Sequence, residues 1–227
     1  MSRVGILVFP GSNCERDVFT VLSKYSGLVP ELIWHTKNDL SGYDAFIVPG
    51  GFTYGDSLRA GAIAAHSPVI RELKKIAEQN VPVLGICNGF QILVESNLLP
   101  GALTVNSSHK FVCKSASLVV ENNTTPFTSM FEKGESISIP VAHGQGRYVI
   151  DNRAYRKLER NNQIIIRYAY NDINGSMNNV AAVSNEQGNI VGMMPHPERA
   201  ISTRTREDVL PEESGVFESL RNHLLRH

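Results

Sequence analysis

A cysteine stands between a buried apolar run and an amphipathic segment near the middle of the chain. The run Val83 to Ile86 precedes Cys87, and the segment after it carries apolar residues at helical spacing. Gly85 and Gly89 flank the cysteine and provide the room or the unusual dihedral angles that a sharp strand-to-helix turn requires. This is the pattern of a nucleophile elbow with Cys in place of Ser, and the helix dipole would stabilise a thiolate there. The alternative interpretation of Cys87 is a buried structural cysteine.

A histidine and a carboxylate lie two positions apart near the other end of the chain. His196 and Glu198 alternate with Pro195 and Pro197, whose rings restrict the backbone. In an extended segment alternate residues point the same way, so the imidazole and the carboxylate can meet. A Cys at an elbow, a His and a carboxylate that orients the His would form a nucleophilic triad. The pair by itself would be interpreted as a surface loop.

The elements that must position these groups alternate between strand and helix in the first half. Strands are predicted over 4–9, 28–34, 45–48 and 83–86, and helices over 13–25 and 68–79. Ser12 and Glu15 have the spacing of a capping box at the first helix, and Cys14 in its first turn is a rival nucleophile without an elbow. A glycine-rich loop, 49–61, follows a buried strand and suggests backbone amides presented to a ligand, or else an ordinary loop.

The second half changes character and predicts a small antiparallel portion. Strands are expected over 110–120, 137–149 and 163–168, a hairpin over 180–184 and 190–194, and helices over 151–160 and 216–225. Together the two halves predict an α/β fold in a single domain, 1–227. Its core is a doubly wound, mostly parallel sheet with helices on both faces, a flavodoxin-like arrangement. In such sheets ligands sit at the carboxyl ends of the strands, where 49–51 and Cys87 both fall.

Composition narrows the class of protein. The 227 residues carry 22 basic and 22 acidic side chains, which suggests neither nucleic-acid nor membrane binding. The sequence shows no bilayer-spanning apolar stretch and no signal-peptide pattern, and three cysteines without metal-ligand spacing suit a reducing cytoplasm. Glycosylation sequons beginning at Asn106, Asn122, Asn123 and Asn174 are therefore interpreted as chance matches.

Several segments resemble one family closely. Gly85-Ile-Cys-Asn-Gly-Phe-Gln91 is similar to the G-x-C-x-G-x-Q signature of class I (triad-type) glutamine amidotransferases, and 195–198 to their second signature. Segments 9–16, 49–56, 142–144 and 194–200 resemble, within that family, the PurQ-type glutaminase subunits of phosphoribosylformylglycinamidine synthase. Gln145 departs from that pattern, where Glu is usual, and so does Asn171-Asp-Ile-Asn-Gly-Ser176.

The resemblance implies hydrolysis of L-glutamine through a Cys87 thioester. His196 would act as acid and then as base, and Glu198 would hold the imidazole. The amide of Asn88 is the first candidate donor to the oxyanion, and by resemblance the Gly50-Gly51 loop supplies the second. Gln91, one helical turn from Cys87, is expected to contact the substrate or the glycine-rich loop. His143 is placed near the amino-acid end of the substrate through its main chain.

The implied reaction also needs partners. Ammonia in water is largely protonated, so a glutaminase without its own ATP-binding motif should dock on a synthetase. By resemblance the partners are a large ATP-dependent synthetase subunit, which would hold ATP and Mg²⁺, and a small accessory subunit, and no cofactor or metal is expected in this chain. The complex would convert formylglycinamide ribonucleotide (FGAR) to formylglycinamidine ribonucleotide (FGAM) in purine biosynthesis. The loop 54–59 and the charged segment 199–206 are expected at the interface, with Arg59 and Arg204 contributing.

Three other functions remain open on the sequence. One is a glutaminase serving a different synthetase, against which segments 9–16 and 54–56 argue. Another is a Cys-dependent peptidase or chaperone of related fold, which would not need Gln91 or the Pro-His-Pro-Glu segment. The last is a non-catalytic binding module, which a complete triad disfavours.

Overall fold

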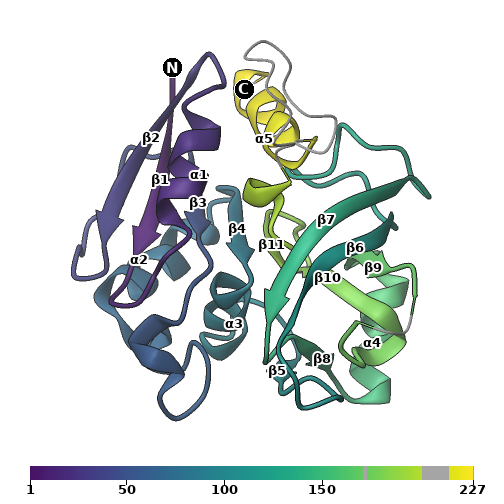
Figure 1. Cartoon of the computed structure of the whole chain (residues 1–227). Helices are drawn as coiled ribbons and strands as arrows, with labels where there is room; N and C mark the ends of the chain where they lie inside the picture. Colours follow the sequence, from purple (N-terminus) through teal and green to yellow (C-terminus); the bar gives the residue numbers. More distant parts are fainter. Residues whose placement is uncertain (171–172, 201–214, 227) are drawn as a thin grey trace.

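The structure, a computed structural model, describes residues 1–170, 173–200 and 215–226 (Figure 1). Its largest element is a nine-stranded sheet with the order β2-β1-β3-β4-β11-β10-β9-β6-β7. The strands are β1 (Ser2–Val8), β2 (Leu28–Trp34), β3 (Ala45–Val48), β4 (Val83–Ile86), β6 (Val112–Val120), β7 (Ser136–His143), β9 (Ile164–Tyr168), β10 (Val180–Ser184) and β11 (Ile190–Met193). The helices are α1 (Glu15–Leu22), α2 (Pro68–Ala77), α3 (Asn88–Glu95), α4 (Asn152–Arg160) and α5 (Gly215–Leu225).

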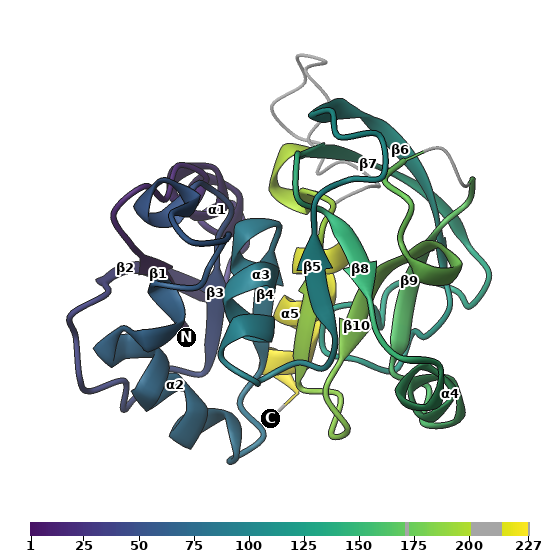
Figure 2. The ribbon, with the colours of Figure 1, turned by 90° about the horizontal axis from the view of Figure 1, so that it is seen from below.

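One half of the sheet is parallel and doubly wound. The strands β2, β1, β3, β4 and β11 pair in parallel. The chain moves from β1 to β2 in one direction and from β3 to β4 in the other, so right-handed crossovers place α1 and α2 on opposite faces. Figure 2 shows α1 and α2 on opposite sides of β1 and β3.

The strands at the centre of this half are covered on both faces. Every residue of β3, β4 and β11 is buried. That agrees with their continuous apolar sequences, because a parallel strand between two helix layers has no solvent-facing side. Burying one Val, Leu or Ile side chain contributes about 1.5–3 kcal/mol, so these strands form a firm base for the loops at their carboxyl ends.

The other half of the sheet is antiparallel. The strands β10, β9, β6 and β7 continue from β11 with antiparallel pairing throughout. A separate two-stranded sheet joins β5 (Ala102–Thr104) to β8 (Arg147–Val149). The helix α4 is capped by Asp151, whose carboxylate accepts from the amides of Arg153 and Ala154, both at 2.9 Å.

The predicted fold class is confirmed, and the antiparallel portion takes in four strands of the large sheet within the described residues. The predicted hairpin is present as β10 and β11. The prediction of one continuous strand over 137–149 is wrong. The strand β7 ends at His143, and β8 belongs to the separate two-stranded sheet. The chain turns there because Gly146 lies against the His143 ring, where a Cβ would be 2.3 Å from Nδ1.

The start of the first helix also differs from the prediction. The helix α1 begins at Glu15 and ends at Leu22, which is shorter than the predicted helix over 13–25. The capping box does not form, because the Ser12 hydroxyl accepts from the Phe9 amide at 3.0 Å instead. Cys14 therefore occupies the N-cap position, with no side-chain capping bond.

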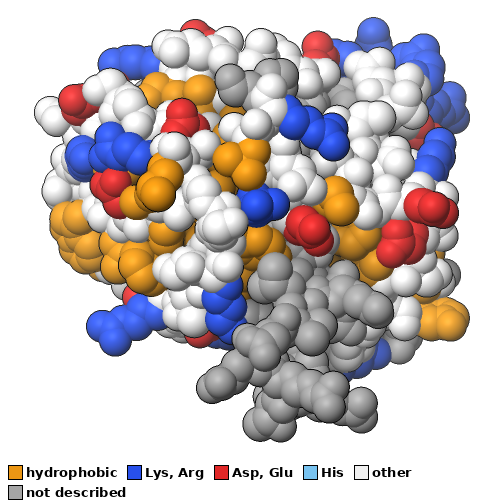
Figure 3. Space-filling view, turned by 90° about the horizontal axis from the view of Figure 1, so that it is seen from above, with side chains coloured by type: hydrophobic (Ala, Val, Ile, Leu, Met, Phe, Trp, Pro, Cys, Tyr) orange, Lys and Arg blue, Asp and Glu red, His pale blue; other side chains and the backbone are white. Residues whose placement is uncertain are grey.

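The surface agrees with the balanced charge of the sequence. Figure 3 shows Lys and Arg side chains interspersed with Asp and Glu over the face that is seen from above. Among the described helices, none has the length and apolar character needed to cross a membrane. The predicted interface residue Arg204 and most of segment 199–206 lie outside the described residues.

Candidate active site

The elbow that the sequence predicts is present at the end of β4. Cys87 has φ 49° and ψ −104°, a conformation that few non-glycine residues adopt and that other contacts must hold in place. The Cys87 amide donates to the Met193 carbonyl at 2.8 Å, which ties the turn to β11. A Cβ on Gly89 would lie 1.8 Å from the Val48 carbonyl oxygen, so α3 can approach β3 this closely only with glycine there. The elbow thus presents its sulphur at the carboxyl edge of the sheet.

His196 and Glu198 form a buried pair. The imidazole Nδ1 lies 2.7 Å from Glu198 Oε1, and both residues are 2 % exposed. The segment is not the extended one that the sequence predicts: Pro197–Arg199 forms a 3₁₀ turn, η4, and this turn brings the carboxylate back to the ring. The His196 amide donates to the Pro140 carbonyl at 2.8 Å, so β7 also fixes the segment.

The electrostatics of His196 favour its cationic form. Burial lowers the pKa of His196, but the negative charges of Glu198 and Cys87 raise it, and the pKa lies well above its ordinary value. Glu198 has the larger of these two raising effects on the ring. Nε2 of His196 is buried and has no partner among the described residues, so this nitrogen is left for groups that enter the site.

The sulphur and the imidazole face one pocket of about 430 Å³. This volume falls within the range of about 300–1,000 Å³ that is typical of small-molecule sites. Cys87, His196, His143 and Gln91 line it, together with Gly51 from the glycine-rich loop. The meeting of Cys87 and His196 that the sequence interpretation required is therefore present, while Glu198 supports the ring from behind.

The glycine-rich loop packs directly on the predicted triad. A Cβ on Gly50 would lie 2.8 Å from Cε1 of His196, so only glycine leaves room for the ring. Gly51 has φ 154°, and a Cβ there would lie 2.7 Å from the Gly11 carbonyl oxygen. Ser12 and Gly51 pair as an isolated β-bridge. Its hydrogen bonds come from the residues beside them: the Phe52 amide donates to the Gly11 carbonyl and the Asn13 amide to the Gly50 carbonyl. The Gly51 amide takes no part in these hydrogen bonds.

Asn88 connects this loop to the elbow. Its Oδ1 accepts from the Thr53 amide at 3.1 Å, and its Nδ2 donates to Gln91 Oε1 at 2.8 Å. Gln91 Nε2 in turn donates to the Gln145 carbonyl at 2.7 Å. The Asn88 main-chain amide lies at the first position of α3, where no carbonyl of the helix can accept from it. Side chains thus fix the backbone around the candidate oxyanion donors.

Gln145 contributes to this chain of hydrogen bonds through its main chain. It is the main-chain carbonyl of Gln145 that accepts from Gln91, and any residue supplies that group. The other departure from the family pattern lies behind the same loop: Asn174 Nδ2 donates to the Gly146 carbonyl at 2.8 Å. Residues 171 and 172 lie outside the described residues.

His143 enters the site from the end of β7 and is 2 % exposed. Its Nδ1 lies 3.1 Å from Oδ1 of Asn106, which also accepts from the Gly146 amide at 3.0 Å. Burial, followed by the positive charge of His196, lowers the pKa of His143 to about 4. The ring is therefore neutral at pH 7 with Nδ1 as donor, and its buried Nε2 is unpartnered within the described chain.

Asn106 is a residue that sequence reasoning missed. The sequence marks it only as part of a glycosylation sequon, yet it is fully buried and cannot accept a glycan. Its Nδ2 donates to the carbonyls of Lys110 and His143, both at 2.9 Å. No local sequence signal points to this role, because it depends on a partner from a distant segment of the chain.

Cys14 lines the same pocket and lies close to the imidazole. Its Sγ is 4.0 Å from His196 Nδ1, the nitrogen that Glu198 also engages. Burial raises the pKa of the Cys14 thiol, and this effect outweighs the hydrogen bond with His196, which lowers it. Cys14 has neither the elbow backbone of Cys87 nor a favoured thiolate, so it is the weaker candidate for a nucleophile.

A buried thiol at a strained elbow, opposed by a His–Glu pair across a small pocket, is the arrangement of a triad-type cysteine hydrolase. The family model described as CobB/CobQ-like glutamine amidotransferase domain matches residues 1–223. The chain belongs to this family of glutamine amidotransferases.

The chain is similar to two PurQ subunits over nearly its whole length. The chain is 49% identical to the phosphoribosylformylglycinamidine synthase subunit PurQ of Chlorobaculum parvum, over 98% of this chain and 90% of the relative. It is 48% identical to the same subunit of Chlorobaculum tepidum, with 97% of each chain covered.

Solved structures share the fold of this chain. A chain of the structure of PurLQS from Thermotoga maritima superposes with a TM-score of 0.86 at 47% identity, covering 98% of this chain and 99% of that one. Another glutamine amidotransferase from Thermotoga maritima has a TM-score of 0.61 at 15% identity, with 99% and 96% covered, and supports the fold alone.

Proposed function

We propose that this chain hydrolyses L-glutamine to L-glutamate and ammonia, and passes the ammonia to an ATP-dependent synthetase that converts FGAR to FGAM in purine biosynthesis. The observation that carries the proposal is the pocket shared by Cys87 and His196, with Glu198 2.7 Å from the far nitrogen of the ring. The family and its PurQ relatives point to glutamine as the substrate.

The first half of the reaction makes a thioester. The Cys87 thiolate attacks the carbon of the γ-carboxamide, and the carbonyl oxygen becomes an oxyanion. His196 transfers a proton from Nε2 to the leaving nitrogen, so the C–N bond breaks and ammonia departs. The raised pKa of His196 keeps that proton available at neutral pH.

The second half consumes water. Neutral His196 takes a proton from a water molecule, which attacks the thioester carbon, and the C–S bond breaks to give glutamate and the thiolate. Glu198 keeps Nδ1 as the donor and stabilises the cationic ring. The amides of Asn88 and Gly51 are proposed as the oxyanion donors, and losing one such donor typically costs about 3 kcal/mol of transition-state stabilisation.

Three further residues are proposed to form the part of the pocket that receives the rest of the substrate. These are Gln91, His143 and Gly144, which line the same pocket as Cys87. Gln91 is already committed to Asn88 and the Gln145 carbonyl, so its part is to fix the pocket wall more than to bind glutamine directly.

The partners are proposed from the same similarity: a large synthetase subunit, which would hold ATP and Mg²⁺, and a small accessory subunit. We propose no cofactor for this chain, which would be one glutaminase domain in the cytoplasm. The loop 54–59 is the proposed docking segment, since it borders the site and presents Leu58 at 91% exposure. Arg59, in the same loop, is paired with Glu95 of α3 at 2.7 Å.

The test combines labelling with turnover. A glutamine analogue that alkylates active-site thiols should modify Cys87, located by peptide mass spectrometry, and leave exposed Cys113 unmodified at equal concentration. With the synthetase subunits present, Cys87→Ser should abolish glutamine-dependent FGAM formation and retain ammonia-dependent formation. Glutamine-dependent turnover by Cys87→Ser would reject the covalent mechanism. Normal glutaminase activity without FGAM formation would instead point to a different synthetase.

A further inference from the structure

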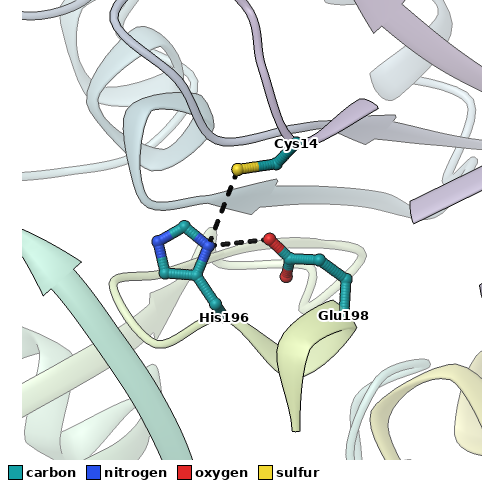
Figure 4. Close-up of side chains that lie close together, drawn as sticks. All are labelled: Cys14, His196 and Glu198. Carbon is teal, nitrogen blue, oxygen red and sulfur yellow. Dashed lines mark hydrogen bonds and ion pairs between the residues drawn. The ribbon is translucent and has the colours of Figure 1, made fainter. Parts of the chain in front are cut away.

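Three different metal-binding atoms gather beside the pocket, which Cys14 and His196 both line. Cys14 Sγ, His196 Nδ1 and a carboxylate oxygen of Glu198 all lie within 4.8 Å of one another, the one such cluster among the residues that the structure describes (Figure 4). Cys14 Sγ lies 4.0 Å and Glu198 Oε1 2.7 Å from the same nitrogen. Cys14 comes from near the start of the chain, and His196 and Glu198 come from near its end. Figure 4 shows the three side chains pointing toward one place.

The cluster is buried and not fully satisfied. The three residues are 1 %, 2 % and 2 % exposed. Oε2 of Glu198 has no hydrogen-bond partner in the described part of the chain. A buried carboxylate oxygen without a donor is costly, and a cation is one group that can relieve the cost. Neither this oxygen nor the Cys14 thiol has a part in the proposed hydrolysis.

We propose that Cys14, His196 and Glu198 form a binding site for Zn²⁺ or a similar divalent transition metal. A thiolate, an imidazole and a carboxylate are the donors that Zn²⁺ takes, and three protein ligands leave a fourth position for water from the pocket. Mg²⁺ and Ca²⁺ are not expected, because they require mostly oxygen ligands.

The distances are close to those of a tetrahedral site. Zn–S of about 2.3 Å and Zn–N of about 2.0 Å place the sulphur about 3.6 Å from the nitrogen. The same geometry places the nitrogen about 3.4 Å from the oxygen. Compared with the observed 4.0 Å and 2.7 Å, the sulphur must move in by about 0.4 Å and the carboxylate out by about 0.7 Å. Side-chain rotations provide shifts of this size without moving the backbone.

The charges also balance. Binding breaks the S–H bond of Cys14 and the N–H bond at Nδ1 of His196, and the two protons go to solvent as the metal bonds form. The thiolate and the Glu198 carboxylate then neutralise the dication. Arg199 is the nearby cation, and it is paired with Asp17 at 3.2 Å.

Occupation of this site should stop the proposed glutaminase, a consequence that rests on the proposed function. The metal would take Nδ1, so the ring would lose the hydrogen bond through which Glu198 orients it. Cys87 is not among the three clustered ligands, so it would remain free. The site would therefore inhibit by removing the acid–base group and not by capping the nucleophile.

The experiment is a Co²⁺ titration of the full, reduced and chelator-treated chain. Co²⁺ bound to a thiolate gives a charge-transfer band in the near ultraviolet, and its visible bands report four-coordinate geometry. We expect one equivalent to bind in the wild type, in Cys87→Ser and in Cys113→Ser. We expect Cys14→Ser to lose the charge-transfer band and at least tenfold in affinity, and Zn²⁺ to displace Co²⁺ in the wild type.

Two results would contradict the proposed metal site. One is a band lost in Cys87→Ser and kept in Cys14→Ser, which would place the metal on the proposed nucleophile. The other is no charge-transfer band in the wild type. Cys14→Ala and Glu198→Gln, checked for folding by circular dichroism, provide second variants that should also bind more weakly. The absorbance bands report metal binding directly, so the experiment tests the metal site even if the chain shows no glutaminase activity.

Discussion

The neutral state of buried His143 predicts how stability depends on pH. Its pKa is lowered to about 4 by burial and by the charge of His196, whereas a histidine in an unfolded chain titrates near pH 6.5. Between these values the unfolded chain binds a proton that the folded chain does not. Folding stability is therefore present above about pH 6.5 and is lost as the pH falls toward 4.

The size of the effect follows from the shift. The difference of about 2.5 pKa units corresponds to about 3 kcal/mol. His196 does not contribute in this window: its folded pKa is raised, so its stabilising effect is fully present below pH 6.5 and is lost only as the pH rises through the raised value. Acidic side chains do titrate here, so a variant must isolate the imidazole.

The assay is urea unfolding of the wild type and of His143→Gln at half-unit steps from pH 7 to 4.5. Glutamine removes the titrating ring and keeps a polar group near Asn106. The stability gap between the two proteins should shrink by about 2–3 kcal/mol across the series. Exposed His66→Gln is the matched control, and its curve should follow the wild type. Parallel curves for the wild type and His143→Gln would refute the reasoning.

Three glycines give further predictions. Gly89→Ala, which would stabilise an ordinary helix by about 1 kcal/mol, should instead cost about 3 kcal/mol or more, because its Cβ would meet the Val48 carbonyl oxygen at 1.8 Å. Thermal unfolding measures this. Gly144→Ala, whose Cβ would make only an ordinary contact at 3.6 Å, should change stability by less than about 0.5 kcal/mol, and an equal effect of the two would contradict the clash. Gly50→Ala should displace His196 and lower glutaminase turnover about 100-fold, whereas undiminished turnover would show that the loop can yield.

The local parts of the site could be predicted from sequence. The elbow at Cys87 depends on a strand, two glycines and a helix that are adjacent in the chain, and short-range patterns specify such turns. The pairing of His196 with Glu198 is also predictable, although the sequence suggests an extended segment and the structure has a 3₁₀ turn. The prolines on either side of His196 restrict the backbone but allow either geometry.

The long-range parts could not be predicted in this way. The strand β4 pairs with β11 in the register of Val83 with Ile190, and no periodicity relates segments so far apart. Cys14 meets His196 across 182 positions, so its place in the sequence suggests a rival nucleophile and not a neighbour of the imidazole. The turn at 144–146 is predicted as continuous strand, because its packing partner, the His143 ring, becomes apparent only in three dimensions.

The position of β11 also governs when the enzyme can first act during its own synthesis. This strand lies between β4 and β10 and leads directly into the segment of His196. A ribosome adding about 5–20 residues per second needs roughly 5–20 s to go from Cys87 to His196. Throughout that interval the emerging polypeptide carries its sulphur without an acid–base partner. Prematurely terminated products should therefore be inert toward glutamine, and the cell is spared ammonia released where no acceptor waits.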